Sequence, residues 1–175
     1  MEDSTAIAEL LAREEIRGVL MDLARGTDRL DAELIRSCYH PDALDDHNAF
    51  RGGPAEFADW VLANLTHFAA TMHFVGNVRI ELSGDAAWSE AYCLAHHLFR
   101  PDDPDGERDL VLGLRYFDRF ERRAAQPGHG ARWKIALRRC VFDWSYTVPI
   151  AEKWPFAADF TVGRRVRSDA SYRRE

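Results

Sequence analysis

The chain has 175 residues and a formal net charge of −6 at pH 7, with 46% hydrophobic and 30% charged residues. This composition is that of a globular domain long enough to enclose a core and a pocket. The acidic balance argues against nucleic acid as the main partner, because phosphate binding needs a basic face. Because the sequence shows neither an apolar run of membrane-spanning length nor a signal-peptide pattern, we expect a cytoplasmic protein without a membrane partner.

Cysteine, histidine and glycine spacings argue against several kinds of site. Cys38, Cys93 and Cys140 are odd in number and widely spaced, so neither a disulfide framework nor a zinc site is indicated. The histidines show neither HxH nor HExxH spacing, and we expect no bound metal. There is no GxSxG motif and no glycine-rich phosphate loop, so the sequence implies neither a nucleophilic serine nor an organic cofactor.

The first part of the chain has the apolar spacing of helices. The predicted helices cover residues 5–26, 31–38 and 55–68. The first of them stops near Gly26, so Asp28 lies where the chain turns away from a long helix. Pro41 predicts a break over residues 39–42, and residues 43–50 are then expected to be extended.

The second part alternates as strands do. The predicted strands cover residues 71–82, 87–99, 109–122 and 131–144, with glycine, proline and aspartate at the junctions. Because helices come first and long strands last, we predict an α+β fold. A cone-shaped, curved antiparallel sheet would pack against the N-terminal helices within a single domain of residues 1–150.

The C-terminal tail, residues 151–175, could cap this domain or a neighbouring subunit. It contains the one basic cluster of the chain, which consists of Arg164, Arg165, Arg167, Arg173 and Arg174. We expect this cluster to be a solvated surface rather than a binding patch.

An acid/base pair is indicated at Asp28 and His73. Histidine is the side chain whose proton moves near neutral pH, although a single histidine in a strand is more often a core residue bonded to a backbone carbonyl. A carboxylate partner would fix its tautomer and increase its basicity. Asp28 is the candidate partner, because Asp31 serves equally well as the cap of the second helix and leaves Asp28 without a local role.

Two further imidazoles compete for the role of general acid. His47 closes the polar cluster Asp45-Asp46-His47 and could protonate a leaving hydroxyl or hold a carbonyl oxygen, or could be an exposed loop residue. On the second strand, alternation puts His97 on the face with small residues, so we place His97 in the cavity and His96 outside. A register shift of one residue would exchange them.

The rest of the pocket is predicted from the last strands and from large apolar side chains. Arg138 and Asp118 lie on neighbouring strands, where opposite charges usually form structural ion pairs, but Arg138 could instead hold substrate charge or an oxyanion. The residues expected to line the pocket are Phe50, Trp60, Phe68, Met72 and Phe142. Tyr92, Leu94 and Tyr116 are placed on the outer face of the sheet, which suggests a homodimer or homotrimer.

Several segments resemble a known superfamily. Residues 28–47, 72–76 and 133–136 resemble the scytalone dehydratase branch of the SnoaL-like, nuclear-transport-factor-2-like superfamily, whose order of elements fits residues 5–150. The resemblance implies the cystatin-like cone fold. It also places Asp28 on the family's catalytic aspartate, His73 on its base histidine and His97 near its second pocket histidine.

Other positions depart from the family's pattern. His47 and Thr27 fall where the scytalone dehydratases have tyrosines, and Val111 and Gly113 replace polar pocket residues on the third long strand. Arg138 loosely resembles a strand arginine of the dehydrochlorinases. The base pair is kept while the groups that polarise the substrate are changed, which supports the chemistry class rather than the scytalone substrate.

The expected function is that of a cofactor-independent lyase acting on a small aromatic or cyclic hydroxylated compound. Asp28 would orient His73, which would remove a proton, while His47, His97 or water would protonate the leaving oxygen. The same pair could serve dehydration, retro-aldol cleavage or an isomerisation of the ketosteroid isomerase or polyketide cyclase kind. A non-catalytic binding or assembly domain on the same fold is the alternative.

Overall fold

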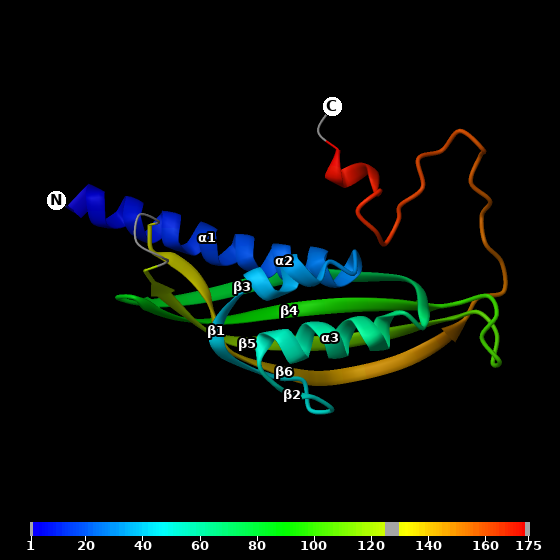
Figure 1. Ribbon diagram of the computed structural model, residues 1–175, viewed down its shortest axis with the longest axis horizontal. Coiled ribbons are helices and arrows are strands. Elements are labelled where there is room, and N and C mark those ends of the chain that lie inside the picture. The colour runs from blue at the N-terminus through cyan, green and yellow to red at the C-terminus, as the bar shows by residue number, and fades with distance from the viewer. Residues whose placement is uncertain (1, 125–129, 174–175) are drawn as a thin grey trace.

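The computed structural model describes residues 2–124 and 130–173 (Figure 1). The helices are α1 (Glu2–Asp28), α2 (Ala32–Ser37), α3 (Pro54–Leu65) and the short 3₁₀ helix η1 (Ala170–Tyr172). The strands are β1 (Tyr39–Asp46), β2 (Arg51–Gly52), β3 (Phe68–Ser83), β4 (Ala86–Phe99), β5 (Arg108–Arg123) and β6 (Arg132–Pro149). Among the described residues, no helix has both the length and the apolar character needed to cross a membrane.

The strands form a curved six-stranded sheet in the order β2-β1-β6-β5-β4-β3. The four long strands pair antiparallel, as predicted, whereas β1 joins β6 in parallel and makes the sheet mixed. In Figure 1 α1, α2 and α3 lie on one side of the sheet, whereas the C-terminal tail with η1 stands apart from it. The predicted α+β class, with a curved sheet packed against N-terminal helices, is therefore confirmed.

Several element boundaries differ from the prediction, and β6 extends to Pro149, beyond its predicted end at residue 144. The expected break at residues 39–42 is wrong, because β1 begins at Tyr39 and runs through Pro41. The register of β1 against β6 shifts between Tyr39 and Leu44, where a proline without an N–H is tolerated. The third helix ends at Leu65 instead of residue 68, and β3 begins at Phe68, three residues before its predicted start.

The junction between α1 and α2 is built by local chemistry. Leu30 has a φ of 53°, in the left-handed region that ends helices. Asp31 then caps α2 by accepting a hydrogen bond from the Leu34 backbone N–H at 3.2 Å. A Cβ at Gly26 would lie 3.0 Å from Cγ1 of Ile35, so glycine allows α2 to pack closely on α1. Asp28 is therefore the last residue of α1, and its side chain faces β3.

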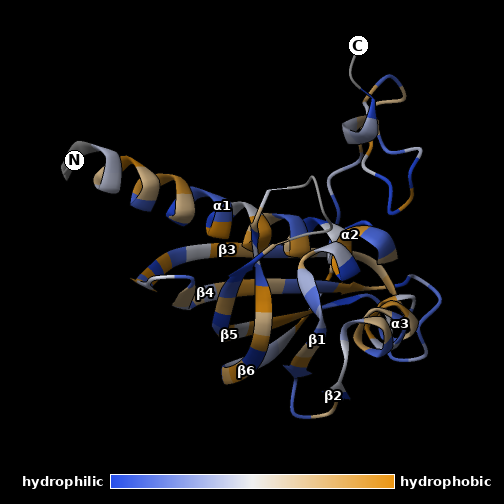
Figure 2. Cartoon of the chain, turned by 60° about the vertical axis from the view of Figure 1, so that its left-hand side comes forward, coloured by the Kyte–Doolittle hydropathy of each residue, from blue (hydrophilic) through white to orange (hydrophobic). Residues whose placement is uncertain are grey.

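The main hydrophobic core lies between the helices and the sheet, where the apolar sides of α1 and the strands meet (Figure 2). Its largest fully buried side chains include Ile16, Ile35, Tyr39, Phe120 and Ile135. Burying a side chain of this size stabilises the fold by about 1.5–3 kcal/mol. These residues hold α1 against the sheet and so set the distance between Asp28 and the start of β3.

The tail leaves the end of β6, loops away and returns to the junction of α1 and α2 (Figure 1). The expectation that its basic cluster is solvated is wrong for Arg165, which is partly buried and donates hydrogen bonds to backbone carbonyls of the domain. Arg167 pairs with Asp31 and Glu33 but stays exposed, with 64% of its side chain accessible to water. Arg174 lies outside the described residues.

Candidate active site

A cavity of about 150 Å³ lies between α1, α3 and the face of the sheet that the helices cover. Most of its lining is apolar, including Leu20 and Leu23 of α1 and Val61 of α3. Its polar lining residues are Thr27, His47, Asn64, His73, His97, Tyr116 and Arg138. An apolar cavity with a few convergent polar groups is the usual form of a small-molecule site.

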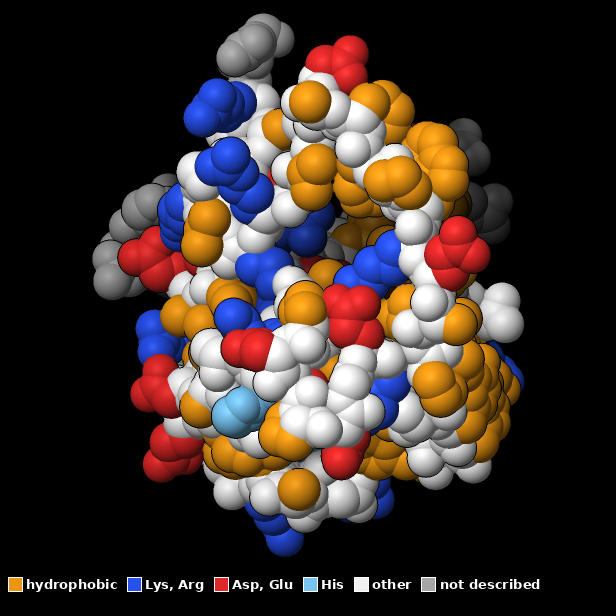
Figure 3. Space-filling model, turned by 90° about the vertical axis from the view of Figure 1, so that its right-hand side faces the viewer, with side chains coloured by type: hydrophobic (Ala, Val, Ile, Leu, Met, Phe, Trp, Pro, Cys, Tyr) orange, Lys and Arg blue, Asp and Glu red, His pale blue; other side chains and the backbone are white. Residues whose placement is uncertain are grey.

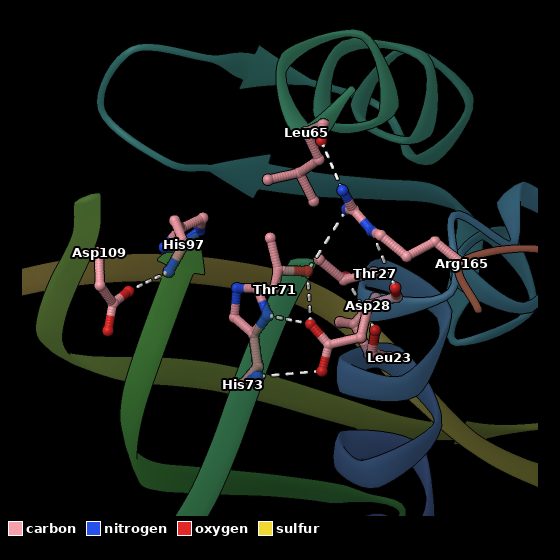
Figure 4. Close-up of polar contacts among 9 residues, drawn as sticks. All are labelled: Leu23, Thr27, Asp28, Leu65, Thr71, His73, His97, Asp109 and Arg165. Carbon is pink, nitrogen blue, oxygen red and sulfur yellow. Dashed lines mark hydrogen bonds and ion pairs between the residues drawn. The ribbon is translucent and has the colours of Figure 1, made fainter. Parts of the chain in front are cut away.

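Asp28 and His73 meet at the edge of this cavity (Figure 4). Nδ1 of His73 lies 2.8 Å from Oδ1 of Asp28, and the His73 backbone N–H donates to Oδ2 at 3.0 Å. The Thr71 hydroxyl donates to Oδ1 at 2.8 Å. The structure thus brings the two predicted residues together across 45 positions of the chain.

The electrostatics of this pair favour an ionised carboxylate. Burial acts to raise the pKa of Asp28, but the hydrogen bonds and charge of His73, together with Thr71, outweigh it and lower the pKa below its usual value. The carboxylate then accepts Nδ1–H, which leaves Nε2 of His73 with its lone pair available. That is the tautomer a general base needs.

His97 is a second cavity histidine, and it has a different environment. Its ring meets that of His73 edge-on, with centroids 5.4 Å apart, and its Nδ1 is buried without a hydrogen-bond partner. Burial, followed by the nearby charge of His73, lowers the pKa of His97 to about 4. His97 is therefore neutral at pH 7 and suited to hydrogen bonding rather than to proton donation. The predicted faces are confirmed, since the His96 side chain is 41% exposed on the outer side.

His47 belongs to a second histidine–aspartate pair. Its Nδ1 contacts Oδ1 of Asp45, whose side chain is completely buried. The other oxygen of Asp45 accepts a hydrogen bond from the Tyr39 hydroxyl at 2.5 Å. The roles of Asp45 and Tyr39 were not predicted from the sequence. The i, i+2 spacing of Asp45 and His47 at the end of a strand was the available signal, because such residues share a face.

Arg138 forms the expected structural ion pair and also lines the cavity. Its Nε and Nη2 donate to the two carboxylate oxygens of Asp118 at 2.8 and 2.7 Å, and both side chains are buried. The guanidinium also lies 4.0 Å from the centroid of the Tyr116 ring and lines the cavity. The ion pair spans β5 and β6, and thus a buried charge is held at the cavity wall.

The predicted aromatic lining is partly reproduced. Trp60 and Phe142 line the cavity. Phe50 lies behind, stacked on Trp60 at 5.2 Å, and Phe68 contacts the ring of His97 edge-on at 5.0 Å. Met72 was expected in the pocket and is 63% exposed. It precedes His73 in a strand, so its side chain faces the opposite side of the sheet.

The prediction exchanged the two faces of β5, because its register was wrong by one residue. Leu112, Leu114 and Tyr116 line the cavity, so Tyr116 is not on the outer face. Val111 and Gly113 alternate with them and face outward, and are not pocket positions. The polar group that β5 supplies to the cavity is therefore the phenol of Tyr116.

The described residues contain no cluster of three or more histidine, cysteine, aspartate or glutamate side chains placed to hold a metal ion. Cys38, Cys93 and Cys140 are buried and unpaired. Burial raises the pKa of the Cys38 and Cys140 thiols to about 12, so they are not nucleophiles at neutral pH. The polar chemistry of the cavity therefore rests on its imidazoles, Tyr116 and Arg138.

The fold is shared with solved structures of low sequence identity. Hexachlorocyclohexane dehydrochlorinase LinA-type3 from Novosphingobium barchaimii superposes with a TM-score of 0.72 at 18% identity, over 86% of this chain and 99% of that chain. A scytalone dehydratase-like protein from Novosphingobium aromaticivorans superposes with a TM-score of 0.65 at 21% identity, over 88% of this chain and 100% of that chain. These likenesses establish the architecture.

Sequence comparison identifies the family. The uncharacterized protein Rv2910c of Mycobacterium tuberculosis is 30% identical over 122 residues, which cover 67% of this chain and 80% of that protein. The family model of the SnoaL-like domain matches residues 8–139. This range includes most of α1 with Asp28, the Asp45–His47 pair at the end of β1, and the strand positions of His73, His97 and Arg138. The chain belongs to the SnoaL-like domain family.

Proposed function

We propose that the protein is a cofactor-independent lyase that eliminates water from a small cyclic or aromatic hydroxylated compound. The observation that carries the proposal is the Asp28–His73 pair, in which the carboxylate engages Nδ1 and leaves Nε2 free at an apolar cavity. Nε2 accepts a proton from the carbon next to a carbonyl or aryl group. The electron pair forms a C=C bond as the C–O bond breaks.

The leaving oxygen requires a proton, and His47 is the group best placed to supply it. Asp45 holds Nδ1 of His47, so protonated His47 presents its Nε2–H to the same cavity that His73 lines. His97, neutral and with an unpartnered Nδ1, is suited to hold a substrate hydroxyl. Water leaves, His73 ends protonated and His47 deprotonated, and proton exchange with solvent restores both.

The size of the cavity limits the substrate. A cavity of about 150 Å³ is in the size class that accommodates a single six-membered ring. Trp60, Phe142 and the leucines of α1 and β5 provide apolar contacts to such a ring. The position of His73 in the lining of an apolar cavity supports a site that receives a small molecule over a purely structural role for the pair.

The test is a panel of single-ring β-hydroxy carbonyl compounds and aryl propanediols, followed by the absorbance of the new conjugated double bond. We expect turnover by the parent, with His73→Ala lower by about 10²–10⁴-fold and Asp28→Ala also impaired. His96→Ala is the matched control, since His96 lies on the outer face. Turnover by His73→Ala and Asp28→Ala at the parent rate would overturn the proposal.

A further inference from the structure

Arg165 of the tail reaches into the domain beside the acid/base pair (Figure 4). Its Nη1 donates to the backbone carbonyls of Leu65 and Phe68, each at 2.8 Å, and its Nε donates to the carbonyl of Asp28 at 3.3 Å. Its Nη2 donates to the Thr71 hydroxyl oxygen at 3.4 Å. One guanidinium therefore joins the end of α1, the end of α3 and the beginning of β3.

These contacts use the chemistry of helix ends. The last carbonyls of an α-helix lack partners within the helix and carry the negative end of its dipole. Asp28 is the last residue of α1 and Leu65 the last residue of α3. A guanidinium, always charged and with N–H groups in a fixed planar fork, can satisfy both ends together. On this side of the molecule Figure 3 shows a hollow with Lys and Arg side chains around it.

Thr71 transmits the contact to the carboxylate. A hydroxyl has one proton, and because the oxygen of Thr71 accepts from Arg165, that proton is directed to Oδ1 of Asp28. The same Oδ1 lies 2.8 Å from Nδ1 of His73. A continuous chain of hydrogen bonds thus runs from the tail to the histidine.

We propose that Arg165 is a positioning residue that orients the Asp28 carboxylate toward His73 through Thr71, and that the tail thereby completes the active site. The effect of Arg165 on the reaction rate rests on the proposed function, whereas its effect on the tautomer of His73 does not. Arg167 offers a contrast within the same tail, because it pairs with Asp31 and Glu33 of the α2 region and is not bonded to Thr71 or Asp28 in the described residues.

The first measurement is the tautomer of neutral His73, read from the ¹⁵N shifts of its ring nitrogens. In the parent, Asp28 should hold the Nδ1–H form. Arg165→Gln should introduce a substantial fraction of the Nε2–H form, because the carboxylate loses its fixed orientation. With an elimination substrate, kcat should fall about tenfold with KM changed less than about twofold, as expected for a misplaced orienting group. Arg167→Gln, the matched control, should keep the parent tautomer and kcat.

A double-mutant cycle with Thr71→Val tests the route. If Arg165 acts through Thr71, the double variant should show the same tautomer ratio and kcat as Thr71→Val alone. Fully additive effects, or equal effects of Arg165→Gln and Arg167→Gln, would overturn the proposal. If circular dichroism shows that Arg165→Gln is unfolded, the tautomer of His73 is measured in Arg165→Lys instead. Lysine keeps the charge without the fork, and a parent tautomer ratio in this variant would also overturn the proposal.

The two proposals fail in distinguishable ways. A tautomer change in Arg165→Gln with full activity in His73→Ala would sustain the positioning role and reject the lyase mechanism. A rate that depends on His73 but is the same in Arg165→Gln and Arg167→Gln would sustain the lyase mechanism and reject the positioning role of Arg165.

Discussion

The Asp28–His73 and Asp45–His47 pairs present their histidines to one cavity but are assembled differently. The first joins the end of α1 to β3 across 45 residues, and its carboxylate accepts from Thr71 and from the His73 backbone as well as from the ring. The second is local, because its members are two positions apart in the chain, and its carboxylate is fully buried beside Tyr39. The first therefore depends on how helix and sheet are held, and the second on the conformation of one strand.

The largest expected difference between the two pairs is in activity. His73→Gln should lower kcat/KM for elimination by about 10²–10⁴-fold and His47→Gln by about 10–10²-fold, because water can replace an acid more readily than a base that must take a proton from carbon. Steady-state kinetics on a hydroxyl substrate measures both values.

The leaving group separates the two roles. With a chloride in place of the hydroxyl, the leaving group needs no proton, so the loss in His47→Gln should disappear while that in His73→Gln persists. A loss in His47→Gln that is the same for both substrates would contradict its assignment as the acid.

The Asp45–His47 pair should matter more than the Asp28–His73 pair for the free energy of unfolding, although it matters less for activity. Asp45→Asn should lower the free energy of unfolding by about 3 kcal/mol, because a fully buried carboxylate that binds both Tyr39 and His47 is replaced by an amide. Asp28→Asn should lower it by only about 1 kcal/mol, since its side chain is 13% exposed to water. Urea unfolding at pH 7 compares the two, and equal losses would mean that burial does not distinguish them.

His97 differs from both paired histidines, because its Nδ1 has no hydrogen-bond partner among the described residues. Its folded pKa of about 4 lies below the usual value, so between the two values the unfolded chain binds a proton that the folded chain does not. Stability should therefore fall on acidification from pH 7 to pH 5, with about 2 kcal/mol of the loss due to His97. In urea unfolding, His97→Gln should remove that part, whereas His96→Gln should retain it.

The smallest expected effect concerns Asp28 in acid. Its folded pKa is lowered, so its contribution to stability is present above the unfolded value of about 3.9 and is lost as the pH falls below it. The stability difference between the parent and Asp28→Asn should shrink from about 1 kcal/mol at pH 7 to nearly zero at about pH 2. An unchanged difference would show that the carboxylate charge is not what the variant removes.

The outer face of the sheet stays a proposed contact surface between subunits. Met72, Phe74, Tyr92, Trp144 and Tyr146 are each about half exposed or more. Exposed apolar residues that gather on one face often mark an interaction site. Sedimentation would show whether the chain forms the expected homodimer or homotrimer.

Local patterns were sufficient for much of the fold. Periodicity predicted the three α-helices and the four long strands within a few residues, and cap chemistry predicted Asp31 at the start of α2. Pro41 misled the prediction because a register shift lets β1 include it. Met72 and Tyr116 were placed on the wrong faces, although strict alternation from His73 would have put Met72 outside.

The element order, the α+β class and the residue types available for acid/base chemistry could be predicted without the fold, because they follow from short-range spacing and from side-chain identity. The sequence also marked Asp28 as a carboxylate without a local role. The folded chain was needed to show that Asp45 meets His47, that burial keeps His97 neutral and that Arg165 reaches the site. These properties depend on burial and on contacts between segments as far apart as α1, β3 and the tail, and no local pattern encodes such distances.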